Sequence, residues 1–145
     1  MISVTYTEPA FRIRKEKEKV LIFDAIRRVW LPLTEEEWVR QNFVQYLVEV
    51  LHYPSTLIAI EKEILLNDLK KRFDILVYDR NLKPWMLVEC KAPSVLLSES
   101  VLHQVLRYNM SVPVTFLIIT NGSYTYGWEK VGSDLRELEV MPVFM

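Results

Sequence analysis

The sequence predicts a mixed β-sheet with helices packed on it, an α/β protein of the α+β sandwich type. Two helical patterns enclose three short strand patterns, and a strongly apolar strand pattern follows the second helix. Polar connections of a few residues join the three middle strands, so an antiparallel meander is the natural topology. The expected order of the core elements is therefore helix, three strands, helix, strand.

Length and composition favour one globular unit. The chain has 145 residues, of which 50% are apolar and 26% charged, and no linker-like run interrupts it. We therefore expect a single domain over residues 1–145. No apolar stretch approaches the roughly 20 residues that span a bilayer. The N-terminus also lacks the features of a secretory signal, so the sequence predicts a cytoplasmic location without membrane contact.

The N-terminal part combines a charged segment with a hairpin. Residues 12–19 alternate cations with acids, and we expect residues 1–19 to form a charged arm, with 12–19 as a solvated segment or a strand edge. Residues 20–23 and 26–33 are rich in β-branched and aromatic side chains. Asp24-Ala25 separates them, so this region is interpreted as a small hairpin.

Two helices are predicted. Residues 34–37, Thr-Glu-Glu-Glu, match the capping box at a helix start, in which a hydroxyl and a carboxylate three residues later satisfy free amides. Apolar residues then recur at helical spacing up to Leu51, and Pro54 ends the pattern. This apolar stripe should lie on a sheet. The second helix is expected over residues 98–109.

The strand patterns occupy the rest of the chain. The three middle strands are expected over residues 57–66, 73–78 and 85–89, separated by turns at 67–70 and 80–84. A further strand is expected over residues 114–120. The Asn-Gly dipeptide that follows it is typical of a hairpin turn. The partner strand should therefore carry the alternating residues Tyr124, Tyr126 and Trp128.

Composition excludes several kinds of chemistry. One cysteine and two histidines are too few for a disulfide framework, a thiolate-rich metal site or most imidazole sites. Gly122 and Gly127 have the spacing of a phosphate-binding loop, but the Gly-Lys-Ser/Thr ending is missing, which excludes nucleotide hydrolysis of that type. The formal charge of −1 gives no global nucleic-acid signature, although it permits a local basic patch.

Charged residues stand where core strands usually carry apolar ones. Asp74 lies at the start of one strand pattern, and Glu89 and Lys91 lie at the end of the next. Because side chains alternate along a strand, Glu89 and Lys91 should share a face, while Cys90 points to the opposite side as a buried small residue. A short connection between antiparallel strands then brings Asp74 beside Glu89.

Two carboxylates and an ammonium in this arrangement suit a divalent metal. Mg²⁺, or Mn²⁺ in its place, binds through one or two carboxylates together with water and substrate oxygens. We expect Asp74 and Glu89 as the protein ligands, with the backbone carbonyl of Cys90 as a further oxygen. Such a metal activates water and stabilises charge on a phosphodiester, and Lys91 would orient the water or neutralise developing charge.

The segments around these residues resemble the PD-(D/E)xK nuclease superfamily, and more specifically the N-terminal nuclease domain of type I restriction enzyme R subunits. The matching stretches cover the first helix, both site strands and the Gln-x-x-x-Tyr pattern of Gln104 and Tyr108. The resemblance implies a restriction-endonuclease-like fold with Asp74, Glu89 and Lys91 as catalytic residues. It also implies DNA as substrate, with a homodimer or separate motor and specificity subunits as partners. Phe73 replaces the proline of the motif, and no helicase motor follows in this sequence.

Several other residues are candidates near the site or the nucleic acid, each with a plainer alternative. Glu37 is a candidate metal-side acid, although the capping box alone explains it. The remaining candidates are divided between near-site roles for Gln41, Gln104 and Tyr108 and nucleic-acid contacts for Arg40, Lys62 and Arg72. Packing or a solvated surface is the alternative for these six.

The function that these features favour is that of a Mg²⁺-dependent DNA nuclease. The alternative is a catalytically silent nucleic-acid-binding or assembly module that keeps the nuclease fold. The near-neutral net charge favours the alternative slightly, because DNA affinity would then depend on a local patch or a partner. The complete Asp74, Glu89 and Lys91 set opposes it, since nothing structural requires three charges there.

Overall fold

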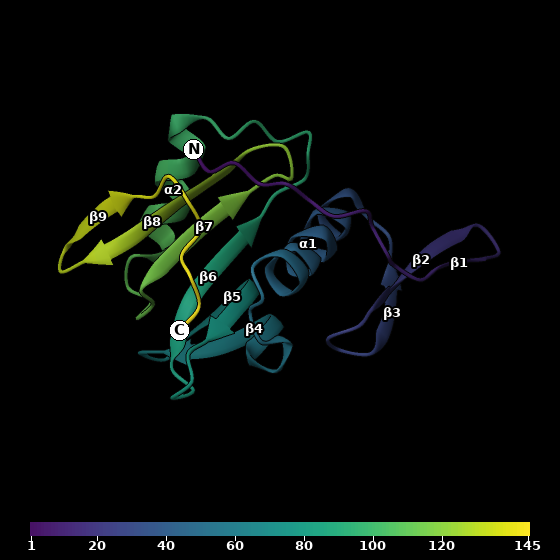
Figure 1. Ribbon diagram of the computed structural model, residues 1–145, viewed down its shortest axis with the longest axis horizontal. Coiled ribbons are helices and arrows are strands. Elements are labelled where there is room, and N and C mark those ends of the chain that lie inside the picture. The colour runs from purple at the N-terminus through teal and green to yellow at the C-terminus, as the bar shows by residue number, and fades with distance from the viewer.

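The computed structural model describes residues 1–145 and contains a central six-stranded sheet (Figure 1). Its strands, in spatial order, are β4 (Ile58–Leu66), β5 (Leu69–Tyr78), β6 (Pro84–Cys90), β7 (Phe116–Thr120), β8 (Thr125–Val131) and β9 (Asp134–Glu137). Only β6 and β7 are parallel. A parallel pair needs a crossover, which contains helix α2 (Glu99–Asn109). The predicted α/β class and the order helix, three strands, helix, strand are confirmed.

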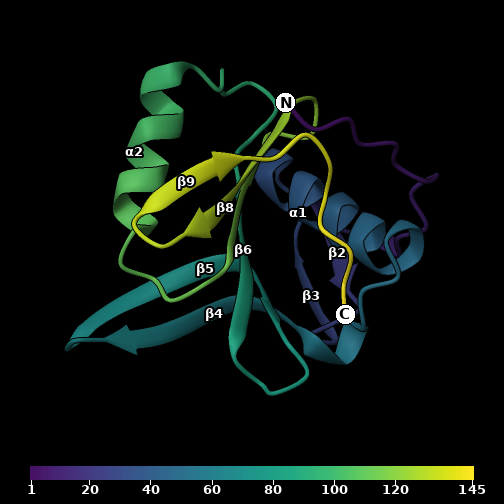
Figure 2. The same cartoon turned by 60° about the vertical axis from the view of Figure 1, so that its left-hand side comes forward.

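The two helices cover opposite faces of this sheet, so the molecule has three layers (Figure 2). Helix α1 (Glu35–Gln45) packs on one face and α2 on the other. Strand β5 shows the alternation directly, because Ile75 and Val77 belong to the core under α1, whereas Leu76 belongs to the core under α2. The apolar stripe predicted for the first helix therefore lies on a sheet, as expected.

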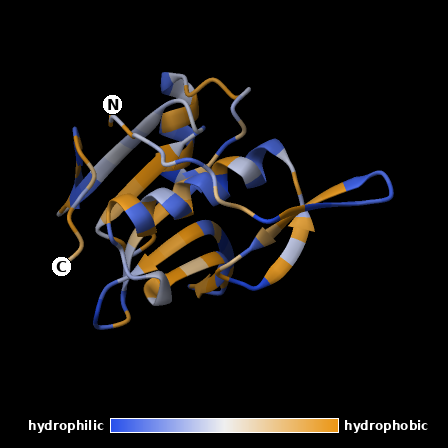
Figure 3. Ribbon diagram, turned by 45° about the vertical axis from the view of Figure 1, so that its right-hand side comes forward, coloured by the Kyte–Doolittle hydropathy of each residue, from blue (hydrophilic) through white to orange (hydrophobic).

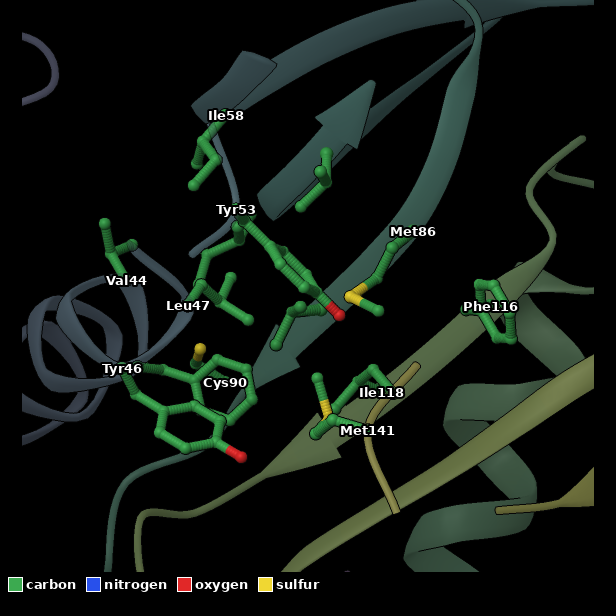
Figure 4. Packing of buried hydrophobic residues seen from close by; sticks show 14 of the residues in the cluster. Val44, Tyr46, Leu47, Tyr53, Ile58, Met86, Cys90, Phe116, Ile118 and Met141 are labelled. Carbon is green, nitrogen blue, oxygen red and sulfur yellow. The ribbon is translucent and has the colours of Figure 1, made fainter. Parts of the chain in front are cut away.

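The larger core gathers residues from distant parts of the chain (Figure 4). Tyr53, which follows the first helical region, lies beside Met86 of β6, and Ile118 of β7 lies beside Met141 near the C-terminus. The Tyr53 hydroxyl donates a hydrogen bond to the carbonyl of Pro142 at 2.6 Å. The C-terminal segment is thereby fixed across the edge of this core.

The first helix starts as predicted, but it changes form before it ends. The Thr34 hydroxyl accepts a hydrogen bond from the Glu37 amide at 3.0 Å, which is one half of the capping box. From Tyr46 to Val50 the chain widens into a π-helical segment, closed by the Leu51 amide donating to the Tyr46 carbonyl. A short 3₁₀ turn, Ser55–Leu57, then leads into β4. No helix is both long and apolar enough to cross a bilayer.

A second, three-stranded sheet precedes the first helix and projects from the body of the molecule (Figure 1). It consists of β1 (Ile13–Glu16), β2 (Lys19–Asp24) and β3 (Val29–Pro32), all antiparallel. The predicted hairpin is thus present, with a turn that extends to Arg28. The charged segment expected as an arm or a strand edge forms the outer strand β1 and its turn, and Figure 3 shows that turn as a hydrophilic tip.

One turn and one strand differ from the sequence-based expectations. Asn67 and Asp68 both have positive φ, at 49° and 66°, so they form a two-residue hairpin turn and β5 begins already at Leu69. The C-terminal strand β9 was not predicted. It pairs with β8 through the turn that contains Gly132, whose φ is 62°. Its four residues are too few and too polar to stand out by pattern.

The core under α1 predicts a clear contrast between two leucines. Leu47 is fully buried, whereas the side chain of Leu65 is 63% exposed on β4. Leu47→Ala should lower the free energy of unfolding by about 2 to 5 kcal/mol, because it leaves a cavity in close-packed surroundings. Leu65→Ala should change it by less than about 0.5 kcal/mol. Urea denaturation of both variants measures the difference, and equal losses would contradict the described core.

Candidate active site

The structure brings Asp74, Glu89 and Lys91 together at the end of β6. Strands β5 and β6 pair Ile75 with Val88, and the next step along both strands places Asp74 opposite Glu89. The Asp74 carboxylate accepts a hydrogen bond from the Cys90 amide at 2.8 Å. The Lys91 ammonium lies 3.7 Å from the Glu89 carboxylate. The Lys91 amide also donates to the Thr120 carbonyl at 2.8 Å, which anchors the end of β6 to β7.

Neighbouring side chains of β6 point to opposite sides of the sheet, so that Glu89 and Cys90 lie on different faces. Cys90 is buried in the core under α1, and burial raises the pKa of its thiol well above the usual value. Glu89 faces the α2 side, where it lines a small internal hollow with Leu87, Leu106 and Asn109. Cys90 is therefore a buried small residue, as predicted, and the polar groups of the site lie on the other side of the strand.

Both carboxyl groups hold their protons more tightly than usual. Burial raises the pKa of Asp74 to about 6, with a further rise from Glu36 and Glu61 and an opposing effect of the Cys90 amide and Arg40. Burial also raises the pKa of Glu89 to about 7, with a further rise from Asp74 and a lowering by Lys91. Two neighbouring carboxylates cannot both ionise easily at neutral pH without a compensating positive charge.

A third acid, Glu61 of β4, completes a row across three strands. The pairs Ile60–Ile75 and Lys62–Phe73 flank Glu61 and Asp74, so these two acids lie opposite each other. Glu61 has a positive φ of 52°, unusual for a residue with a side chain, and regular pairing is interrupted there. Its carboxylate forms an ion pair with Arg72 at 3.0 Å. The row formed by Glu89, Asp74 and Glu61 therefore has Arg72 beside its outermost member.

The acid of the first helix whose charge raises the pKa values of the site is Glu36, whereas the predicted Glu37 is paired with Arg40. Glu36 raises the pKa of both Asp74 and Glu89. It stands three residues before Val39 and seven before Phe43, which are buried against the sheet, so all three share one helix face. Extending the apolar stripe back by one turn would have identified Glu36 from the sequence.

Glu37, Arg40 and Gln41 instead form a buried network with the three-stranded sheet. The Arg40 side chain is 3% exposed, and its guanidinium contacts Asp24 at 3.3 Å and Glu37. Gln41 donates to Glu37 at 3.1 Å. Asp24 also accepts from Arg27 at 2.8 Å, and the pKa of Asp24 is lowered by these hydrogen bonds and charges against the opposing effect of burial. Arg40 is thus enclosed and not available to a nucleic acid, in contrast to the expectation from sequence.

The other candidates lie at the surface on both sides of the site strands. Lys62 and Arg72 are exposed on β4 and β5. Gln104 and Tyr108 are exposed on α2, and Gln104 makes no side-chain hydrogen bond. Lys71 of β5 donates to the Tyr108 carbonyl at 2.5 Å, with its ammonium 4.5 Å from the ring centroid. This contact holds the end of α2 against β5.

The donor set suits a hard cation that keeps part of its water shell. No three His, Cys, Asp or Glu side chains are grouped closely enough to form a complete protein cage. Mg²⁺ does not require one, since one or two carboxylates are enough when water and substrate oxygens complete its coordination. Asp74 and Glu89 provide two such carboxylates, whose raised pKa values show that a nearby positive charge would be stabilising.

Glu89→Gln should stabilise the metal-free protein at pH 8. The pKa of Glu89 rises from 4.5 to about 7 on folding, so ionisation destabilises the folded state increasingly between these pH values and fully above them. Removing the charge should raise the free energy of unfolding at pH 8 by on the order of 1 kcal/mol and have little effect at pH 4. Urea denaturation with a chelator measures this. The exposed Glu63→Gln variant is the control, and a lower stability of the Glu89→Gln variant at pH 8 would contradict the pKa assignment.

Glu36→Gln should lower the pKa of Asp74 and Glu89, because it removes a nearby negative charge. Carboxyl-detected NMR titration measures both values. The matched control is Glu35→Gln, which changes an acid in the same helical turn. If the two variants left the Glu89 titration equally unchanged, the coupling between α1 and the site would be refuted.

Comparison with known proteins identifies a family for most of the chain. A search of curated proteins finds no significant match. A family model described as type I restriction enzyme R protein N terminus matches residues 35–142, from the start of α1 to beyond β9. The matched region contains both helices, the six-stranded sheet and the cluster of Asp74, Glu89 and Lys91. The chain belongs to the type I restriction enzyme R protein N-terminus family.

Proposed function

We propose that the protein is a cytoplasmic Mg²⁺-dependent DNA nuclease that hydrolyses phosphodiester bonds. Membership of the R protein N-terminus family indicates a nuclease-related role. The observation that supports catalysis is the juxtaposition of Asp74 and Glu89, with raised pKa values, beside the Lys91 ammonium. A binding or assembly role would not require two destabilising carboxylates in this position. Their presence has a physical reason if they hold a cation, because the cation would compensate their charge.

Asp74 and Glu89 are the residues that would hold the metal, with the Cys90 carbonyl as a further oxygen donor. When bound, the metal supplies Lewis-acid activation of water and neutralises charge on the phosphodiester. The Cys90 amide fixes one oxygen of Asp74, which leaves its other oxygen for coordination. The sheet thus orients the carboxylate before substrate arrives, which reduces the reorganisation that the reaction requires.

Lys91 acts from the same edge of the sheet. Its ammonium lies 3.7 Å from Glu89, so it is positioned by a partner within the site and not by a distant residue. An ammonium in this place can orient the attacking water and neutralise the negative charge that develops on the phosphate. Lys91 is about one third exposed, which leaves it accessible to a substrate phosphate.

The proposed partners follow from the same chemistry. The substrate is DNA, and the partner is a homodimer copy that would supply a second active site, or separate motor and specificity subunits that would supply translocation and sequence recognition. Glu36 is added to the proposed site as an acid that adjusts the charge around Asp74 and Glu89. Gln104 and Tyr108 remain proposed near-site residues on α2, at the surface facing away from α1.

Purified protein should cleave circular or linear DNA with Mg²⁺ or Mn²⁺, and Lys91→Ala should reduce the rate by at least about a hundredfold. Asp74→Ala and Glu89→Ala should have comparable effects, and EDTA should abolish cleavage. Lys83→Ala, which removes an exposed lysine just before β6, at the end of the strand opposite to the site, is the matched control and should retain the rate. Cleavage that persists in the Lys91→Ala variant or in EDTA would contradict the proposal.

A further inference from the structure

Positive charge is strongly segregated in this nearly neutral chain. Residues 12–33, which comprise the three-stranded sheet, contain seven Lys and Arg residues and only three acids, so their net charge is +4. The remainder of the chain carries −5, which gives the total of −1. The body that contains the candidate site is therefore acidic and repels a polyanion. The projecting sheet is the part of the molecule that can attract one.

Most of the cations of this sheet form no ion pair within the protein. Asp24 is buried and already compensated by Arg27 and Arg40, so it does not offset the exposed charges. Glu16 forms an ion pair with Arg14 at 2.7 Å. No ion pair involves the three lysines at the tip of the β1–β2 hairpin, which are all exposed: Lys15, Lys17 and Lys19. Figure 3 shows this tip extending away from the rest of the structure.

Aromatic rings fix two arginines on one face of the same sheet. The Arg14 guanidinium lies 4.3 Å from the centroid of Trp30, and the Arg12 guanidinium lies 4.9 Å from the centroid of Phe23. Phe23 and Trp30 are paired across β2 and β3 and pack edge to face. Cation–aromatic contacts hold both guanidinium groups in place. The N–H groups of Arg12 remain available to an anion, whereas one N–H group of Arg14 is paired with Glu16.

The sheet is also connected rigidly to the helix that adjoins the site. Asp24, at the end of β2, is joined to Arg40 of α1 by a buried contact of 3.3 Å. The first turn of α1 contains Glu36, which influences Asp74 and Glu89. The three-stranded sheet is therefore joined through α1 to the part of the molecule that contains the carboxylates.

We infer that the three-stranded sheet of residues 12–33 is a surface that binds the sugar–phosphate backbone of DNA and supplies the affinity that the acidic body lacks. This inference rests on the proposed nuclease function, because that function sets the ligand. The sheet precedes the region that the family model matches, which starts at residue 35. Phosphate contacts of this kind carry no sequence information, so the surface contributes affinity and orientation.

The test measures binding without cleavage. In an Asp74→Asn background, the hairpin variant K15Q/K17Q/K19Q is compared with the control K70Q/K83Q/R107Q, which removes three exposed cations elsewhere. Both variants lower the net charge by the same amount, so only the location differs. Fluorescence anisotropy with a short labelled DNA duplex gives Kd over a range of salt concentrations. Thermal denaturation checks that both variants are folded.

The hairpin variant should bind at least about tenfold more weakly at low salt, and the slope of log Kd against log salt should decrease by about 1 to 3. The control should bind within about twofold of the parent. Equal binding by both variants would overturn the inference, because the location of the cations would then make no difference to DNA affinity. A parent that binds no DNA would also overturn it. Binding that depends on the hairpin, without cleavage by the unmutated protein, would contradict the nuclease proposal alone.

Discussion

The hydrogen bond from the Cys90 amide to the Asp74 carboxylate, at 2.8 Å, is the contact on which the candidate site depends. It joins β5 to β6 where their regular pairing ends, and it holds Asp74 beside Glu89. The backbone thus holds two half-buried carboxyl groups together; burial raises the pKa of both, and the charge of Asp74 raises that of Glu89 further. Such an arrangement is unfavourable when both groups are ionised, and the proposed cation would stabilise it.

A second constraint links the N-terminal sheet to this site. Arg40 lies buried between Asp24 of β2 and Glu37 of α1, and removing one partner of such a group would leave an uncompensated charge in the interior. The network fixes the first turn of α1, which contains Glu36, the acid whose charge raises the pKa of Asp74 and Glu89. The positively charged sheet and the acidic site are therefore joined through α1, and in the proposed function the sheet would attract a polyanion while the site would bind a cation.

The sequence was sufficient for the main elements and for the pair Asp74 and Glu89, because strand alternation and short connections determine their position. The sequence does not reveal Glu61, because its position opposite Asp74 depends on a two-residue turn at Asn67-Asp68, and the turn predicted over residues 67–70 gives a different register. The capping pattern distinguishes Glu37 from its neighbours but gives no information on which acid of the first turn lies nearest to the sheet. The burial of Arg40 depends on Asp24, a contact between distant residues that no local pattern reveals.

Titration of Asp74 and Glu89 by carboxyl-detected NMR, with and without Mg²⁺, tests the central claim most directly. The account predicts pKa values near 6 and 7 without the metal. With Mg²⁺ both values should fall, since a bound cation favours the ionised carboxylates. Ordinary carboxyl pKa values without the metal, or values that Mg²⁺ leaves unchanged, would contradict the claim that these two residues form a cation site.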